Sequence, residues 1–445
     1  MKERITAAVE KHRQLILDTE RFVWKHPETG FKEWRTSKYM EDVFESLGYE
    51  ITRAGDIPGF YTVIDTGRPG PEILILGELD SIICASHPES DPVTGAVHSC
   101  GHNAQCAALV GVAAALKEPH MLDELSGKIR LCAVPAEELL EIDFRKELRE
   151  KGTIKYFGGK PEFLRRGYFD GVDLAFMIHS GKNFSVNGGS TGCIAKQIIY
   201  KGKAAHAGGA PQSGRNALYA ATCGLNAINA IRETFTEPDQ IRVHPIITHG
   251  GDMVNAIPEI VTLESYVRGK TSQAIERANS RVNRALVGAA LSIGTNIEII
   301  DIPGYSPLTQ DRDLAEVARD ALAIVQPDTP FTIRTSIGTG SSDMGNLSRV
   351  MPVLHPKVPG QSGTSHGNNY QVANPELACI VSAEWQVAMA CVLLQNGGER
   401  AKEIAKNYEP EFASVPEYLE YLDSLNDCGN RIEYREDGTA EIRLY

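Results

Sequence analysis

A cysteine and two histidines lie close together in the run His98-Ser99-Cys100-Gly101-His102. An apolar, alanine-rich stretch follows at residues 104–116 and predicts a helix. Thiolates and imidazoles are ligands that zinc and similar divalent metals prefer, so this spacing at a helix start indicates a metal site. The alternative is a buried cysteine beside two hydrogen-bonded histidines, and this run alone does not distinguish the two.

Further polar residues follow predicted apolar strands. Asp80, the pair Glu137 and Glu138, and His179 come after residues 73–77, 128–134 and 174–178, respectively. Open α/β sheets place their sites at the carboxyl ends of strands, so we expect these side chains to meet at one sheet edge. Adjacent side chains point in different directions, so one glutamate can bind metal while the other acts on water. A Glu-Glu pair by itself is more often a solvated surface pair.

The elements that position these residues predict an α/β protein with a central mixed sheet and helices on both faces. From residue 192 the order strand-helix-strand-strand-helix-strand is typical of a ferredoxin-like α+β domain. We therefore predict a discontinuous first domain at residues 1–191 and 309–445, and an inserted domain at residues 192–308. The charged segment 144–166 is expected to form a helix and loop whose charges face solvent.

Composition limits the function classes. A chain of 445 residues is long enough for two domains, and its formal net charge of −13 argues against binding to nucleic acid or an anionic membrane. No run approaches the ~20 apolar residues of a membrane-spanning helix, and the N-terminus lacks the apolar core of a signal peptide. The nine scattered cysteines are typical of a reduced protein, so we expect a cytoplasmic location.

The motifs together resemble the aminoacylase/carboxypeptidase family of dinuclear metallopeptidases. The resemblance rests on Gly77-Glu78-Leu79-Asp80, the run from His98 to Asn103, Pro135-Ala136-Glu137-Glu138, His179, the run from Gly202 to Ala207, and Asn255-Ala256-Ile257-Pro258. More narrowly, the chain resembles the amidohydrolase branch with hippurate, auxin-conjugate and p-aminobenzoyl-glutamate hydrolases. Residues 340–348, Gly-Ser-Ser-Asp-Met-Gly-Asn-Leu-Ser, are most similar to the last of these.

The resemblance implies a metallopeptidase domain of the phosphorylase/hydrolase-like fold that holds two divalent ions, Mn²⁺ or Zn²⁺. The ions would be bridged by Cys100 and a water molecule, with His102 and Glu138 on one ion and His179 and His366 on the other. Glu137 would be the general base, and Asp80 is a candidate to orient a metal-bound histidine. His355 competes with His366 as the last ligand, and we favour His366 because a loop position reaches a site more easily.

The inserted domain is expected to act as a lid and to form a homodimer. The resemblance implies that His206 reaches the substrate carbonyl from a partner subunit, and that Asn255 and Arg268 bind the substrate carboxylate. Two positions depart from many relatives, which have Asp in place of Asn103 and His in place of Gln105. Asparagine at this position occurs in the p-aminobenzoyl-glutamate branch, so we interpret Asn103 as a feature of that branch.

The sequence therefore predicts a hydrolase that uses metal-activated water to cleave the amide of an N-acyl or N-aroyl amino acid, a small-molecule conjugate. A dipeptidase or carboxypeptidase on the same scaffold is the alternative enzyme, and ureido hydrolysis would use the same metals. A non-catalytic conjugate-binding subunit would be expected to lack a ligand or the base. Neither Glu137 nor any of the five expected ligands is missing.

Overall fold

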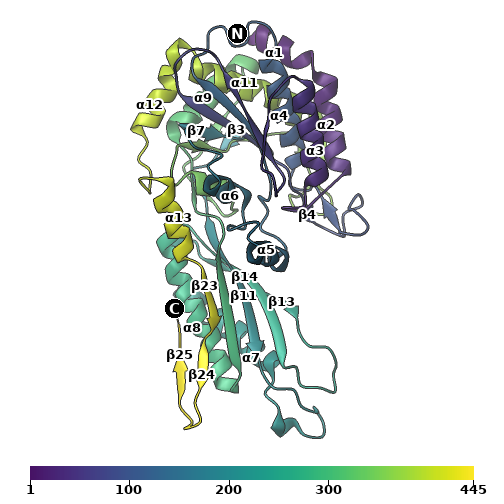
Figure 1. Cartoon of the computed structure of the whole chain (residues 1–445), viewed down its shortest axis with the longest axis vertical. Helices are drawn as coiled ribbons and strands as arrows, with labels where there is room; N and C mark the ends of the chain where they lie inside the picture. The colour runs from purple at the N-terminus through teal and green to yellow at the C-terminus, as the bar shows by residue number, and fades with distance from the viewer. Residues whose placement is uncertain (445) are drawn as a thin grey trace. The chain divides into compact units, whose positions relative to one another are not determined.

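The computed structural model describes residues 1–444, which form two compact units (Figure 1). The first unit contains Met1–Gly189, Leu308–Ser336 and Ser342–Val415. The second contains Ser190–Pro307, Ile337–Ser341 and the chain from Pro416 onward. Each unit has its own buried apolar core.

The first unit is built on a six-stranded mixed sheet in the order β1-β2-β6-β3-β7-β19. The strands are β1 (Thr52–Arg53), β2 (Phe60–Asp65), β3 (Glu72–Glu78), β6 (Lys128–Val134), β7 (Leu174–Phe176) and β19 (Val353–Leu354). Strands β6, β3, β7 and β19 are mutually parallel, whereas β1 and β2 are antiparallel to their neighbours. The carboxyl ends of four strands therefore meet at one edge of the sheet, as expected from the sequence.

Helices pack around this sheet. They are α1 (Lys2–Glu10), α2 (Arg13–Lys25), α3 (Trp34–Ser46), α4 (His102–Leu116), α5 (Ile142–Glu150), α6 (Gly159–Arg165), α9 (Arg312–Val325), α10 (Met344–Leu347), α11 (Ser382–Leu394) and α12 (Glu399–Asn407). Every residue of α4 is buried, and this helix packs against β3, α2 and α11. Its small side chains allow these close approaches on all sides, which explains why it has no polar face.

Short strands form the loops near the carboxyl edge of the sheet. One group pairs in the order β17 (Thr332–Ile333), β9 (Ser185–Val186), β20 (Lys357–Val358), β8 (His179–Ser180). Two further pairs are β4 (Ile82–Ile83) with β5 (Ala96–Val97), and β21 (Gln361–Ser362) with β22 (Gln371–Val372). These pairs fix the loops that carry His179 and the chain around His366.

The segment Glu376–Leu394 is long and apolar enough, by length and composition, to cross a membrane. It consists of a π-helical stretch, Glu376–Val381, followed by α11. Because 89% of its apolar window is buried inside the structure, packing in the core accounts for its composition.

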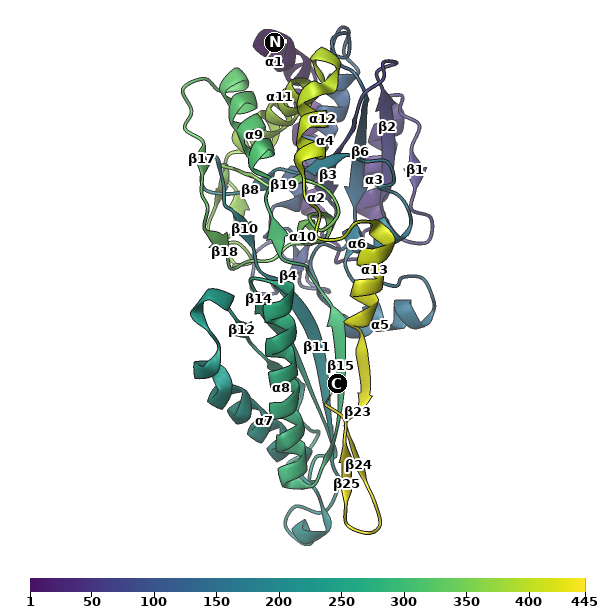
Figure 2. The same cartoon turned by 90° about the vertical axis from the view of Figure 1, so that its left-hand side faces the viewer.

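The second unit is an antiparallel sheet in the order β12-β14-β11-β15-β23, with β13 also paired to β14. Its strands are β11 (Gly192–Lys201), β12 (Arg242–Val243), β13 (Ile246–His249), β14 (Ile260–Gly269), β15 (Asn296–Pro303) and β23 (Asp427–Asn430). Helices α7 (Ala217–Ile231) and α8 (Ser272–Ile293) pack on each other and against this sheet (Figure 2). Strands β12 and β13 are short, follow each other and both pair with β14. Counted as one interrupted strand, they give the order β-α-β-β-α-β, which confirms the expected separate α+β domain.

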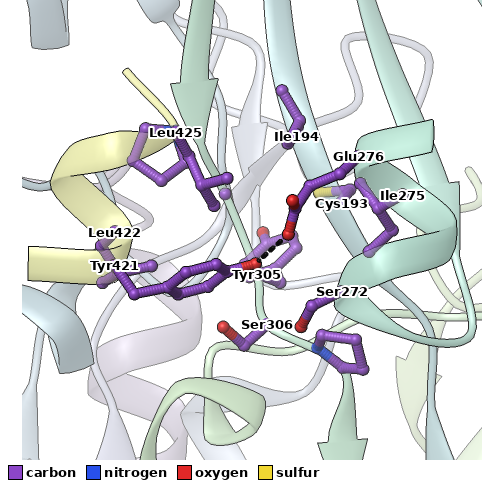
Figure 3. A pocket seen from close by; sticks show the side chains of 13 residues that line it. Cys193, Ile194, Ser272, Ile275, Glu276, Tyr305, Ser306, Tyr421, Leu422 and Leu425 are labelled. Atoms are coloured by element: carbon purple, nitrogen blue, oxygen red, sulfur yellow. Dashed lines mark hydrogen bonds between the residues drawn. The ribbon is translucent and has the colours of Figure 1, made fainter. Parts of the chain in front are cut away.

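The assignment of the C-terminal segment to the first domain was wrong for the chain from Pro416 onward. Strand β23 extends the second sheet by pairing with β15, and a hairpin of β24 (Ile432–Tyr434) and β25 (Ala440–Ile442) follows. Helix α13 (Val415–Ser424) places Tyr421 in a pocket, where its hydroxyl donates to Glu276 Oε1 at 2.8 Å (Figure 3). This segment thus covers an edge of β15 that would otherwise be open, a long-range pairing that local sequence patterns do not reveal.

Candidate metal centre

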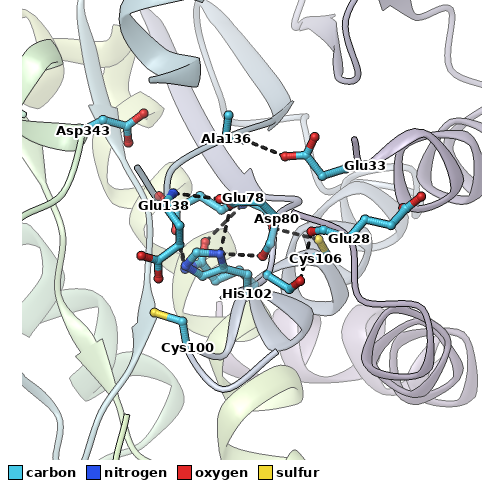
Figure 4. Close-up of polar contacts among 12 residues, drawn as sticks. Glu28, Glu33, Glu78, Asp80, Cys100, His102, Cys106, Ala136, Glu138 and Asp343 are labelled. Carbon is cyan, nitrogen blue, oxygen red and sulfur yellow. Dashed lines mark hydrogen bonds and ion pairs between the residues drawn. The ribbon is translucent and has the colours of Figure 1, made fainter. Parts of the chain in front are cut away.

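The turn after β6 brings Glu137 and Glu138 to the edge of the sheet. Ala136 adopts a left-handed conformation with φ of 56°, which is strained for a residue other than glycine. Its N–H donates to Glu33 Oε1 at 2.7 Å, and the Glu33 side chain is fully buried (Figure 4). The buried carboxylate thus holds a turn that costs about 1–3 kcal/mol in strain. Both glutamates that follow are buried.

Gly101 sets the start of α4 between the two central ligand candidates. It has φ of 92°, and a Cβ added there would meet Ser180 Oγ and Tyr370 Oη at 2.4 Å. Only glycine fits this position, since both the conformation and the space exclude a side chain. Cys100 and His102 are therefore fixed on either side of a rigid helix start.

Asp80 fixes the orientation of His102. The Nδ1 atom of His102 lies 2.8 Å from the Asp80 carbonyl oxygen and 3.2 Å from Asp80 Oδ1. Asp80 Oδ2 in turn accepts the Glu138 N–H at 2.7 Å. With Nδ1 donating, Nε2 carries a lone pair, and this buried atom has no hydrogen-bond partner among residues 1–444, although Glu78 Oε2 lies 3.2 Å away. An oriented imidazole lone pair beside a thiol and a carboxylate is what a divalent metal ion requires, so these residues fit a metal.

The expected ligands lie in groups whose donor atoms are within 4.8 Å of one another. These groups are Cys100 with His102 and His179, Cys100 with Glu138 and His366, and Glu78 with His102 and Glu137. Cys100 belongs to two groups, as a bridging ligand would. The grouping differs from the implied pairing, because His102 lies with His179 rather than with Glu138. Glu78 is a neighbour that the sequence did not single out as a site residue.

The structure places His366, and not His355, in one of these groups. The His366 N–H donates to the Ser99 carbonyl at 2.8 Å, and His366 Nε2 lies 3.1 Å from Glu138 Oε1. His366 has φ of 63°, a second strained residue at this site. The ring of His355 instead packs edge-on against His179, with 5.4 Å between ring centroids. His179 Nε2 itself lies 3.4 Å from Cys100 Sγ.

Electrostatics favour a thiolate at Cys100. Burial alone would raise the pKa of this thiol, but the imidazoles of His102 and His179 lower it well below its ordinary value. Burial and the neighbouring carboxylates of Glu78 and Glu138 raise the pKa of Glu137 well above that of a free glutamate. A general base needs such a raised pKa to take up a proton near neutral pH.

The expectation that the charges of segment 144–166 face solvent was wrong for three residues. Arg145, Lys160 and Glu162 are all buried. Lys160 Nζ donates to Glu78 Oε1 at 2.6 Å and also pairs with Asp343, while the Lys160 N–H donates to Asp343 Oδ2 at 3.0 Å. This ion triad shares Glu78 with the group of Glu78, His102 and Glu137.

One sequence signal could have indicated that the chain around Lys160 packs closely against the turn after β6. Gly159 precedes Lys160, and a Cβ at this glycine would lie 1.7 Å from the Pro135 carbonyl oxygen. A glycine pair, Gly158-Gly159, in an otherwise charged helical segment indicates that backbone meets backbone there.

In the second unit, the structure brings His206 and Asn255 together. Their segments pair through a bridge between His206 and Ala256, and the Ala207 N–H donates to the Asn255 carbonyl at 2.9 Å. His206 Nδ1 accepts the N–H groups of Gly208 and Gly209 at 3.2 and 2.9 Å. The ring proton must then lie on Nε2, so the exposed His206 offers a hydrogen-bond donor.

Arg268 lies at the other end of the same unit. It is near the end of β14, where Gly269 pairs with Gly192, whereas Ile260 at the start of β14 pairs with Lys201. At ~3.4 Å per residue, Arg268 is about 25 Å from the end that carries His206 and Asn255. Arg268 donates to Ser341 Oγ at 2.6 Å. One copy of this unit therefore does not bring the three expected substrate contacts to one place.

Residues 77–386 match peptidase family M20/M25/M40, and this span contains Asp80, Glu137 and all five expected metal ligands. The chain belongs to this family. The M20 chain is 30% identical over 332 residues to a subunit of the p-aminobenzoyl-glutamate hydrolase of Escherichia coli (strain K12). That match covers 72% of this chain and 64% of the relative, slightly less than two thirds of its length.

Two other similarities extend this result. The indole-3-acetyl-aspartic acid hydrolase of Enterobacter agglomerans is 26% identical, over 62% of this chain and 71% of that protein. The Bacillus subtilis YXEP protein, described as a dinuclear metal binding peptidase from the M20 family, has the same fold. Its TM-score is 0.63 at 20% identity, covering 86% of this chain and 99% of that one.

Proposed function

We propose that this M20 protein is a metal-dependent amidohydrolase that cleaves the amide bond of N-acyl or N-aroyl amino acids. The observation that carries the proposal is the buried cluster around Cys100, in which Asp80 holds His102 and leaves its Nε2 without a hydrogen bond. Five residues would hold two divalent ions: Cys100, His102, Glu138, His179 and His366. The thiolate favours Zn²⁺, while the imidazole and carboxylate ligands also suit Mn²⁺.

Glu137 is proposed as the general base. Two divalent ions, when bound, acidify a water molecule and polarise the substrate carbonyl. Glu137 takes the proton of the attacking water at its carboxylate and delivers it to the leaving nitrogen, which must become an amine to depart. Its burial among Glu78 and Glu138 keeps this carboxylate basic enough for that transfer.

His206 is proposed to donate its Nε2–H to the substrate carbonyl oxygen as negative charge develops there. The two glycine N–H groups that bind Nδ1 hold the ring in the tautomer this role needs. Asn255 and Arg268 are proposed to bind the substrate carboxylate. Since His206 and Arg268 lie at opposite ends of the second unit, we propose that His206 acts from a partner subunit.

The edge of the sheet in the second unit is the surface proposed for this partner. The edge strand β13 is exposed along its whole length and carries the exposed apolar side chains of Ile246 and Ile247. Met253 and Val254 in the segment after β13, and Ile260 at the start of β14, are exposed too. An exposed edge strand with apolar side chains is prone to pair with another chain. A second copy of this chain, related by two-fold symmetry, is the proposed occupant.

Subunit complementation tests this arrangement. Co-expressed Glu137→Gln and His206→Ala chains should regain about a quarter of wild-type activity, because random pairing gives half heterodimers, each with one intact site. Both single variants should be nearly inactive alone. If His206 served its own chain, the mixture would stay as inactive as its parts.

The substrate class rests on the relatives, two of which are named for hydrolysing an aroyl-glutamate and an acyl-aspartate. The test is release of free amino acid from N-acyl, N-aroyl and dipeptide substrates, using protein stripped of metal and reloaded with Mn²⁺ or Zn²⁺. Metal-dependent release from acyl or aroyl conjugates is expected. Cleavage restricted to dipeptides would make the protein a dipeptidase, and no cleavage of any amide would refute the proposal.

A further inference from the structure

Lys357 is a cation at the metal centre that none of the roles above uses. It lies on β20, paired in parallel with β8, and its direct partner across the ladder is His179. Paired residues on neighbouring strands project their side chains to the same face of the sheet. The side chain of Lys357 therefore leaves the sheet on the same side as the imidazole of His179.

The stem of Lys357 is fixed by the backbone beside it. A Cβ added at Gly181 would meet the Cβ, Cγ and Cδ atoms of Lys357 at 2.6, 3.3 and 3.5 Å. The absence of a side chain at Gly181 thus makes room for the lysine stem. Lys357 is half-buried, so part of its side chain remains accessible, and burial lowers the pKa of its ammonium.

The ammonium of Lys357 has no fixed counter-ion. Among residues 1–444 it makes neither a hydrogen bond nor an ion pair, in contrast to Lys160, which is paired with Glu78 and Asp343. The anionic groups that act on Lys357 from a distance are Cys100, Glu78 and Glu137. All three belong to the metal centre, where divalent cations would offset their charge.

With metal bound, Lys357 would be a partly desolvated cation beside further positive charge. That arrangement is unfavourable until an anion arrives, so it favours a substrate that brings one. Asn255 and Arg268 are already proposed to bind one substrate carboxylate, so the anion proposed for Lys357 is a second one.

We propose that Lys357 is a specificity-determining residue that binds a second carboxylate of the substrate, and this rests on the proposed amidohydrolase function. The protein then prefers dianionic conjugates over those with a single carboxylate. The second carboxylate has two sources, an acidic side chain on the amino acid or a carboxylate on the acyl group. Both present the same ligand to the ammonium.

The test compares kcat/KM ratios in wild type, Lys357→Met and Lys357→Arg. One substrate pair is N-acetyl-L-glutamate against N-acetyl-L-glutamine, which probes the amino-acid side chain. The other is N-succinyl-L-leucine against its terminal amide, which probes the acyl group. Lys182→Met is the matched control, because it removes an exposed lysine three positions beyond His179. Metal content and thermal midpoint are measured for every variant.

We expect Lys357→Met to lower the dianion-to-monoanion ratio by about 10- to 100-fold for one substrate pair, the loss of one charge-assisted hydrogen bond. Lys357→Arg should restore most of the ratio, and Lys182→Met should leave it unchanged. The pair that responds identifies the source of the carboxylate. If Lys357→Met leaves the kcat/KM ratio unchanged for both substrate pairs while monoanionic conjugates are still hydrolysed, the role of Lys357 is overturned and the proposed function is not. A wild-type protein that hydrolyses no conjugate overturns the proposed function and this assignment with it.

Discussion

Substitution of Lys160 by methionine should strongly destabilise the first unit. The lysine side chain is fully buried, and its ammonium lies between the carboxylates of Glu78 and Asp343, which are buried too. Burial would raise the pKa of Glu78, but Lys160 and His102 beside it lower that pKa well below its ordinary value. Methionine keeps the volume and removes the charge, so two buried carboxylates are left without their cation.

The expected loss is about 3–5 kcal/mol in the free energy of unfolding, the cost of breaking a buried ion pair by removing one partner. A protein of ordinary stability, about 5–15 kcal/mol, would lose a large fraction of it. Urea unfolding followed by tryptophan fluorescence measures this directly. All three tryptophans, Trp24, Trp34 and Trp385, lie in the first unit, so the signal reports that unit.

Lys128→Met is the matched control. Lys128 pairs with Asp65 at 3.7 Å, and both side chains are about half exposed (48% and 57%), so its loss should cost about 0–1 kcal/mol. A triple variant, Lys160→Met with Glu78→Gln and Asp343→Asn, removes all three charges and should recover most of the stability. If Lys160→Met alone does not fold, recovery in the triple variant is the test. A Lys160→Met loss as small as that of the control would refute the reasoning.

Three further predictions concern the metal centre. Glu137→Gln should keep its metal content and lose about 10²- to 10⁴-fold in kcat, and retained turnover would remove this residue from the base role. Asp80→Ala should weaken metal binding about 10- to 100-fold, measured by competition with a chelator, because His102 loses its orienting partner. Burial, with a contribution from the Cys100 thiolate, raises the pKa of Glu138 to about 7 before metal binds. Since a carboxyl must be deprotonated to bind metal, apparent affinity should fall as pH drops below about 7, and affinity independent of pH between 5 and 8 would contradict this.

The sequence predicted the parts of the fold that local patterns determine. Strand β3 is apolar on both faces over residues 73–76, and β6 is apolar over residues 131–134. Their positions could therefore be predicted from the sequence, as could the polar residues that follow them. The structure then brought Asp80, Glu138 and His102 together, because parallel strands end at the same edge.

Long-range partners could not be predicted in the same way. Lys160 pairs with residues 82 and 183 positions away. The glycine pair before it indicates a close backbone approach, but it does not name the carboxylates that Lys160 meets. For the same reason, the pairing of β23 with β15 was missed, since a strand pattern does not name its partner. The free ammonium of Lys357 likewise became visible only once its surroundings were known.

The central claim is that the cluster around Cys100 holds two divalent ions that hydrolysis requires. The most direct measurement titrates metal-stripped protein with Zn²⁺ or Mn²⁺ and follows bound metal and amide hydrolysis in the same samples. Activity should rise until two ions are bound per chain and then stay constant. Full amide hydrolysis by the metal-free protein would contradict the claim that hydrolysis requires these ions. A Cys100→Ala variant that binds as much metal as the wild type would contradict the claim that the cluster around Cys100 holds them.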